Sequence, residues 1–189
     1  MKTQKERYIK EEAETMKGLV HIYEGTGKGK STAGVGLTIR CAGNGFPVVY
    51  SQFLKDGTTG EMNILRKIPN ITVLVEEHHF GFSFLMTPEE KVEAKAAYTA
   101  LFEKVKAAAV EQNARLLVMD EMLDLCNAEL IDTAMVVDFL KNRPEQLEVV
   151  MTGRNPKPEL VELADYITNM NAVKHPFEKG VPARKGIEM

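Results

Sequence analysis

The 189-residue sequence contains no tryptophan and only two cysteines, Cys41 and Cys126. Two cysteines cannot build a disulfide framework, and both lie within apolar patterns, so we expect buried, reduced thiols. No apolar run approaches the roughly 20 residues needed to cross a bilayer, and the charged residues 1–7 lack the apolar segment of a signal peptide. These absences argue against a disulfide scaffold and a membrane protein, and the cytoplasm is the expected location.

An excess of charge of either sign is also missing. The formal net charge is −3, with 44% hydrophobic and 27% charged residues, which is ordinary for a globular protein. A basic surface of the kind that binds nucleic acid is therefore not expected. The length fits one domain over residues 18–189, preceded by a polar, mostly helical arm at residues 1–17.

Apolar runs alternate with helical patterns along the chain. Helices are expected at 30–41, 61–67, 128–142 and 158–164, with a long helix that opens at a capping box formed by Thr87 and Glu90. Strands are expected at 19–23, 47–54, 71–75, 116–119, 147–151 and 166–170. This alternation predicts an α/β fold, with a mainly parallel open sheet and helices on both faces.

A glycine-rich loop joins the first expected strand to the first helix. It comprises Gly25, Thr26, Gly27, Lys28, Gly29, Lys30, Ser31 and Thr32. Glycines let backbone N–H groups curl around an anion, and the start of the following helix adds its dipole. Such loops bind polyphosphate, with the lysine on phosphate oxygens and the hydroxyl on a divalent cation. The usual pattern has a glycine where this chain has Glu24, so the cradle is one residue tighter.

Two adjacent carboxylates, Asp120 and Glu121, follow the strand at 116–119. Ligands of open parallel sheets sit at the carboxyl ends of the strands, so these carboxylates and the loop should meet at one edge. We therefore expect Ser31, Asp120 and Glu121 to serve a magnesium ion, or manganese in its place, together with phosphate oxygens.

The segment at 76–86 follows no regular period and carries several phenylalanines. Its aromatic residues could form a surface for a flat apolar ligand, or they could fold into the core. The adjacent His78 and His79 point to opposite sides of an extended chain and make poor ligands for one metal ion.

Six blocks of this sequence resemble, in order, the motifs of the phosphate-loop class of ATP:cob(I)alamin adenosyltransferases. The blocks lie at 25–32, 52–55, 81–84, 119–122, 152–154 and 164–168, and the tail at 173–188 is similar to the family's C-terminal segment. The resemblance implies a RecA-like phosphate-loop NTPase fold. It also implies transfer of the 5′-deoxyadenosyl group of ATP to cobalt of a reduced corrinoid, cob(I)alamin, with release of triphosphate.

The resemblance assigns roles to individual residues. Lys30 and the rest of the loop would hold the phosphates, with Arg40 and Arg154 as further nucleotide contacts. Phe82 and Phe84 match two aromatics that displace the lower axial ligand of the corrinoid and ease reduction of cobalt. The second is often tryptophan in relatives. A homodimer and a flavoprotein or other electron donor are the implied partners, in cobalamin biosynthesis or salvage.

Two other functions are compatible with the residues taken alone. A small-molecule kinase on the same scaffold would release ADP and need no corrinoid. A nucleotide-responsive module would bind ATP without turnover.

Overall fold

The computed structural model describes residues 16–78 and 80–188. Its centre is a six-stranded sheet in the order β3-β2-β4-β5-β1-β6, in which every pairing is parallel. The strands are β1 (Val20–Glu24), β2 (Val48–Gln52), β3 (Ile71–Val75), β4 (Leu116–Asp120), β5 (Glu148–Gly153) and β6 (Tyr166–Asn169). The predicted α/β class and the parallel sheet are confirmed.

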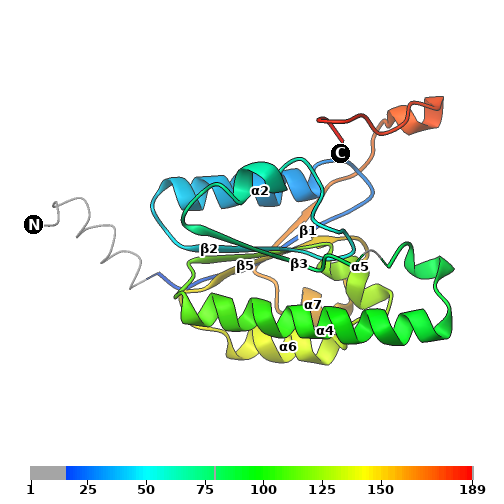
Figure 1. Cartoon of the computed structure of the whole chain (residues 1–189). Coiled ribbons are helices and arrows are strands. Elements are labelled where there is room, and N and C mark those ends of the chain that lie inside the picture. Colours follow the sequence, from blue (N-terminus) through cyan, green and yellow to red (C-terminus); the bar gives the residue numbers. More distant parts are fainter. Residues whose placement is uncertain (1–15, 79, 189) are drawn as a thin grey trace, which may run out of the picture.

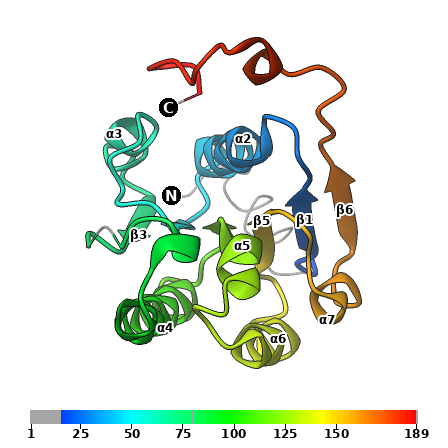
Figure 2. The same ribbon diagram turned by 90° about the vertical axis from the view of Figure 1, so that its right-hand side faces the viewer.

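Helices cover both faces of the sheet (Figures 1 and 2). One face carries α2 (Lys30–Gly43) and the short α3 (Met62–Leu65), and the other carries α4 (Pro88–Glu111), α5 (Met122–Asn127), α6 (Thr133–Asn142) and α7 (Pro158–Val161). Two 3-10 turns, η1 (Ser83–Leu85) and η2 (Pro176–Lys179), lie in the remaining segments. None of the described helices is both long and apolar enough to span a membrane.

Strand side chains alternate between the two cores, as the period of a strand requires. Val49 of β2 belongs to the core on the α4 side of the sheet, whereas its neighbours Val48 and Tyr50 belong to the core on the side of α2 and α3. The central strands β2 and β4 are buried at every position. A parallel sheet covered on both faces therefore delivers the carboxyl ends of β1, β2, β4 and β5 to one common edge.

The expected long helix α4 begins as predicted. The Thr87 side chain accepts from the Glu90 N–H at 3.2 Å, and the Glu90 carboxylate accepts from the Thr87 N–H at 2.8 Å. Pro88 occupies the first turn, where its missing N–H costs no helical hydrogen bond.

The helix expected at 128–142 is confirmed in its C-terminal part, as α6 (Thr133–Asn142), but its predicted start is wrong. The structure has α5 directly after β4, and α6 begins only at Thr133. Glu129 has a positive φ of 58°, which interrupts the helical path, and Asp132 accepts from the Ala134 N–H at 2.9 Å as the cap of α6.

Other expectations differ in smaller ways. Cys126 is buried and free as expected, whereas the free Cys41 is only half-buried. Most of the polar arm at 1–17 lies outside the described residues, as does His79 of the histidine pair.

Candidate active site

The phosphate loop connects β1 to the start of α2. Gly29 adopts a left-handed conformation with φ of 119°, and α2 begins at the next residue, Lys30. The first N–H groups of a helix have no partner within the helix, so the start of α2 presents donors and the positive end of its dipole. The backbone geometry of the loop is therefore compatible with the predicted anion cradle.

The loop is also packed tightly on the chain that follows β6. The Gly27 N–H donates to the Met170 carbonyl at 2.6 Å. A Cβ on Gly25 or on Gly27 would come within 2.6 Å of that same oxygen. Both positions therefore need glycine for a close backbone approach, independently of any phosphate.

Positive charge gathers around this loop. The Lys30 Nζ donates to the carbonyls of Gly25 and Gly27 at 2.8 and 2.9 Å. Burial lowers the pKa of Lys30, and the nearby Arg154 lowers it further. A cavity of about 560 Å³ is lined by residues 26–32, Glu121, Arg154 and the C-terminal segment 171–188. Its cationic wall suits a polyphosphate.

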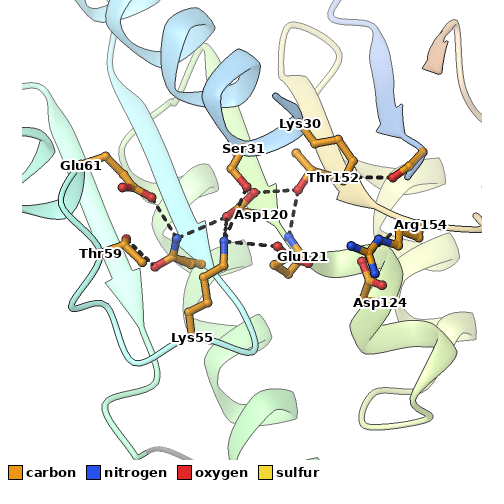
Figure 3. Close-up of polar contacts among 12 residues, drawn as sticks. Lys30, Ser31, Lys55, Thr59, Glu61, Asp120, Glu121, Asp124, Thr152 and Arg154 are labelled. Atoms are coloured by element: carbon orange, nitrogen blue, oxygen red, sulfur yellow. Dashed lines mark hydrogen bonds and ion pairs between the residues drawn. The ribbon is translucent and has the colours of Figure 1, made fainter. Parts of the chain in front are cut away.

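The expected carboxylates stand beside the loop (Figure 3). Asp120 is fully buried at the end of β4, and its Oδ1 accepts from the Thr152 hydroxyl at 2.6 Å. The same hydroxyl accepts from the Glu121 N–H at 3.0 Å, which helps to hold Glu121 at a positive φ of 64°. Thr152 on β5 thereby orients both carboxylate residues.

A lysine that the sequence reasoning left without a role lies between these carboxylates. The Lys55 Nζ is 2.9 Å from Asp120 Oδ2, 3.2 Å from Glu121 Oε1 and 3.5 Å from Ser31 Oγ (Figure 3). The sequence gives Lys55 no role beyond its place in the block at 52–55, because its partners are remote in sequence.

The charges of this cluster depend on one another. Burial alone would raise the pKa of Asp120, but Lys55 and the hydrogen bond from Thr152 lower it below its usual value. Burial raises the pKa of Glu121; Lys55 opposes this rise and Asp120 adds to it. Burial alone would lower the pKa of Lys55, but the two carboxylates raise it. Lys55 therefore stays protonated.

Oxygen atoms of Ser31, Asp120 and Glu121 already converge on one positive charge, so their chemistry and placement fit a hard divalent cation. Among the described residues, no three histidine, cysteine, aspartate or glutamate side chains form a metal-holding group. A cation here would thus need additional ligands such as phosphate oxygens or water.

Phe82 and Phe84 are largely exposed, at 69% and 78%, and their rings stack with centroids 5.4 Å apart. In the same segment Phe80 instead packs on Tyr98, with ring centroids 5.6 Å apart. Both alternatives for this segment therefore hold in part, since the ring of Phe80 packs toward the core and the rings of Phe82 and Phe84 are exposed at the surface. It lies at the same end of the sheet as the phosphate loop (Figures 1 and 2).

The structure does not bring all predicted residues together. Arg154 lies in the cavity wall with the loop, whereas Arg40 lies near the other end of α2, about 15 Å along the helix from Lys30. Arg40 instead lines a separate cavity of about 500 Å³ with His21, Arg115 and Glu148. A nucleotide contact from Arg40 within the same chain is not supported by this placement.

The C-terminal segment adds residues that the site prediction omitted. It turns back over the start of α2 (Figure 2) and contributes Lys174, His175 and Arg184 to the cavity. Arg184 is paired with Glu188 at 2.8 Å. The sequence pointed to this segment only through its similarity to the family's C-terminal segment, without a role in the site.

Comparison with known proteins fits this arrangement. The family model for ATP:corrinoid adenosyltransferases of the BtuR/CobO/CobP type matches residues 16–189. The chain belongs to the ATP:corrinoid adenosyltransferase family. A corrinoid adenosyltransferase of Sinorhizobium sp. is 35% identical over 174 residues, which cover 91% of this chain and 80% of that protein. One from Pseudomonas aeruginosa is 30% identical over 178 residues, 94% of this chain and 86% of its own length.

The solved cytoplasmic domain of EssC superposes with a TM-score of 0.52 at 18% identity. The match covers 89% of this chain, which spans about a third (34%) of that structure, and it shows the fold alone. Membership of the family makes this protein an ATP-dependent enzyme of adenosyl transfer to a corrinoid. The kinase and the nucleotide-responsive module are not favoured.

Proposed function

We propose that this enzyme binds the whole triphosphate of ATP as one leaving group and presents the 5′ carbon of the ribose to cob(I)alamin. In this reaction the cobalt electron pair forms the cobalt–carbon bond, the carbon–oxygen bond breaks, and triphosphate departs with that bond's electrons. One observation carries the proposal. The positively charged cavity at the phosphate loop and the two exposed, stacked phenylalanines lie at the same end of the sheet.

The residues of the chain contribute charge and position, since the nucleophile belongs to the corrinoid. Lys30 is close enough to the loop carbonyls to be held over the cradle, and Arg154 lies in the same cavity wall. Both can stabilise the negative charge that grows on the departing triphosphate. Residues 28–32 would supply backbone N–H donors to the same group.

We further propose that Ser31, Asp120 and Glu121 hold a magnesium or manganese ion through their oxygen atoms. When bound, this ion would neutralise phosphate charge and help to orient the leaving group. Thr152 keeps Asp120 and Glu121 in position through its two hydrogen bonds.

Phe82 and Phe84 are the proposed contacts for the corrinoid. Their stacked rings are exposed and adjacent, which suits contact with a flat apolar face. In this role they would displace the lower ligand of cobalt, so that an external donor, a flavoprotein for example, could reduce it. Phenylalanine at position 84 supplies an aromatic surface for this contact.

A homodimer is proposed as the working form. The outer strand β6 supports it, because all four of its residues are exposed and two, Tyr166 and Ile167, are large and apolar. An exposed strand edge with apolar side chains is a template for pairing with another chain.

Product analysis tests the reaction. Phosphorus NMR of a reaction with ATP, magnesium and cob(I)alamin should show intact triphosphate, and Lys30→Ala should reduce turnover by at least about 100-fold. The control Lys67→Ala removes an exposed lysine outside the site and should leave turnover unchanged. Release of orthophosphate alone, or near-normal turnover by Lys30→Ala, would contradict the proposal.

A comparison of two substrates tests the phenylalanines. Phe82→Ala should impair transfer more strongly from enzymatically reduced cob(II)alamin than from chemically supplied cob(I)alamin, because the ring is assigned to the reduction step. Val92→Ala, at another exposed apolar position, is the control. Equal losses in the two assays would argue against a role in reduction.

A further inference from the structure

The three oxygens assigned to the divalent cation are already shared by one ammonium group. Lys55 Nζ contacts Asp120 Oδ2 at 2.9 Å, Glu121 Oε1 at 3.2 Å and Ser31 Oγ at 3.5 Å. A lysine ammonium and a divalent cation cannot occupy the same space. The position of Lys55 in this structure and the binding of a metal ion at these oxygens are therefore mutually exclusive.

The backbone directs Lys55 into this position. The Phe53 N–H donates to the Asp120 carbonyl at 2.9 Å, which ties the end of β2 to the end of β4. Leu54 then has a positive φ of 56°, an uncommon conformation for leucine, and the chain turns sharply before Lys55. Local strain of this kind persists only where surrounding contacts impose it.

Other side chains also contact the carboxylates, but none of those named here carries a positive charge that could take the place of Lys55. Gln52 Nε2 lies 3.3 Å from Asp120 Oδ2 and 3.4 Å from Glu61 Oε1, and the Thr59 hydroxyl donates to Gln52 Oε1 at 3.2 Å (Figure 3). These groups are neutral or acidic. Among the described residues, Lys55 is the cation that the structure places in contact with both Asp120 and Glu121.

We propose that Lys55 is the resident counter-ion of the metal site and makes metal binding depend on bound nucleotide. In the free protein a metal ion must displace the ammonium, which would then lose its ionic partners. With ATP bound, the phosphates offer the displaced ammonium a new anionic partner, since the phosphate loop and Ser31 adjoin the same cluster. Lys55 is thus a positioning residue that couples the two ligands.

This coupling is reciprocal, because linkage requires each ligand to favour the other by the same factor. Removing the charge of Lys55 should have opposite effects on the two ligands taken singly. The carboxylate pair would attract a metal ion more strongly without nucleotide, and metal-free ATP would bind beside two carboxylates whose negative charge is no longer neutralised by Lys55. General damage to the site would weaken both.

The first experiment measures the binding of Mn²⁺ in the absence of nucleotide by electron paramagnetic resonance. Lys55→Gln should bind Mn²⁺ about tenfold or more tightly than wild type, within the usual range of coupling between sites. The same variant should bind ATP more weakly in the presence of a chelator, as measured by calorimetry. Lys67→Gln removes an exposed lysine elsewhere and should match wild type in both measurements.

A second variant separates charge from folding. Lys55→Arg keeps the positive charge and should hold manganese affinity close to wild type without nucleotide, even if Lys55→Gln is too unstable to purify. Unchanged manganese affinity in Lys55→Gln, or equal tightening in Lys55→Arg and Lys55→Gln, would overturn the inference.

The inference rests on the metal site proposed above, and the two can fail separately. If wild-type protein with ATP shows no spectrum of protein-bound Mn²⁺, the metal site itself is wrong. If wild type shows this spectrum but Lys55→Gln behaves as wild type without nucleotide, the role of Lys55 alone is wrong.

Discussion

Thr152→Val should lower the free energy of unfolding and also disturb the positions of the two carboxylates. Thr152 is 1% exposed, and its hydroxyl donates to Asp120 Oδ1 at 2.6 Å and accepts from the Glu121 N–H at 3.0 Å. Valine has nearly the same shape but no hydroxyl. A hydrogen bond to a charged group contributes about 1.5–3 kcal/mol and an ordinary one about 0.5–1.5 kcal/mol. We therefore expect the free energy of unfolding to fall by about 2–4 kcal/mol.

Urea unfolding at pH 7 measures this change, with Thr152→Ser as the matched control. Serine keeps the hydroxyl and removes one methyl group, so its loss should be closer to about 1 kcal/mol. If Thr152→Val lost less than about 0.5 kcal/mol, the range of ordinary surface substitutions, the hydroxyl would not hold the two carboxylates as described.

The pH dependence gives a second check on the same variant. Because Lys55 and Thr152 outweigh burial, the pKa of Asp120 is lowered in the folded protein. A carboxylate with a lowered pKa stabilises the fold above its unfolded pKa of about 3.9, and this contribution is lost as pH falls toward the folded value. The difference between wild type and Thr152→Val should therefore shrink below about pH 4. A constant difference across that range would contradict the assignment.

Two further changes test other parts of the structure. Gly27→Ala should weaken ATP binding about tenfold or more in calorimetry, because the new Cβ would meet the Met170 carbonyl at 2.6 Å; Gly36→Ala, where a Cβ meets nothing within 4 Å, should not. Glu148 accepts from the Leu19 N–H at 2.8 Å and contacts His21 at 2.6 Å; although burial opposes them, these contacts lower its pKa. In urea unfolding, Glu148→Gln should therefore lose less stability than wild type as the pH falls below about 4.3, the usual pKa of a glutamate, and equal losses would count against these contacts.

The parts of the site that were predictable depend on short-range patterns. A strand followed by glycines and a Gly-Lys-Ser sequence defines the cradle locally, so residues 25–32 could be assigned from the sequence. Asp120 follows an apolar strand, and the rules for parallel sheets place it at the same edge. The six strands could be located for the same reason, because each is a short apolar run bounded by polar or glycine residues.

What could not be predicted depends on contacts between distant segments. Lys55 lies 65 residues from Asp120, and only the pairing of β2 with β4 brings them together. The need for glycine at position 27 comes from Met170, which is remote in the chain. Helix α5 was missed because it has only six residues and begins directly at the carboxylates, where no polar turn marks a boundary.

The shortened loop and the chain after β6 together explain where an anion can bind. The Gly27 N–H already donates to the Met170 carbonyl, so this part of the cradle is fixed by the protein. The donors that remain for a ligand are concentrated at the start of α2, from Lys30 onward, where helix N–H groups lack internal partners. Phosphates bound to these donors would lie beside Ser31, whose Oγ is 3.5 Å from the ammonium of Lys55. On the proposed site, a triphosphate bound at the start of α2 would therefore adjoin the carboxylate–lysine cluster, so a change of charge at Lys55 should alter the affinity for the nucleotide.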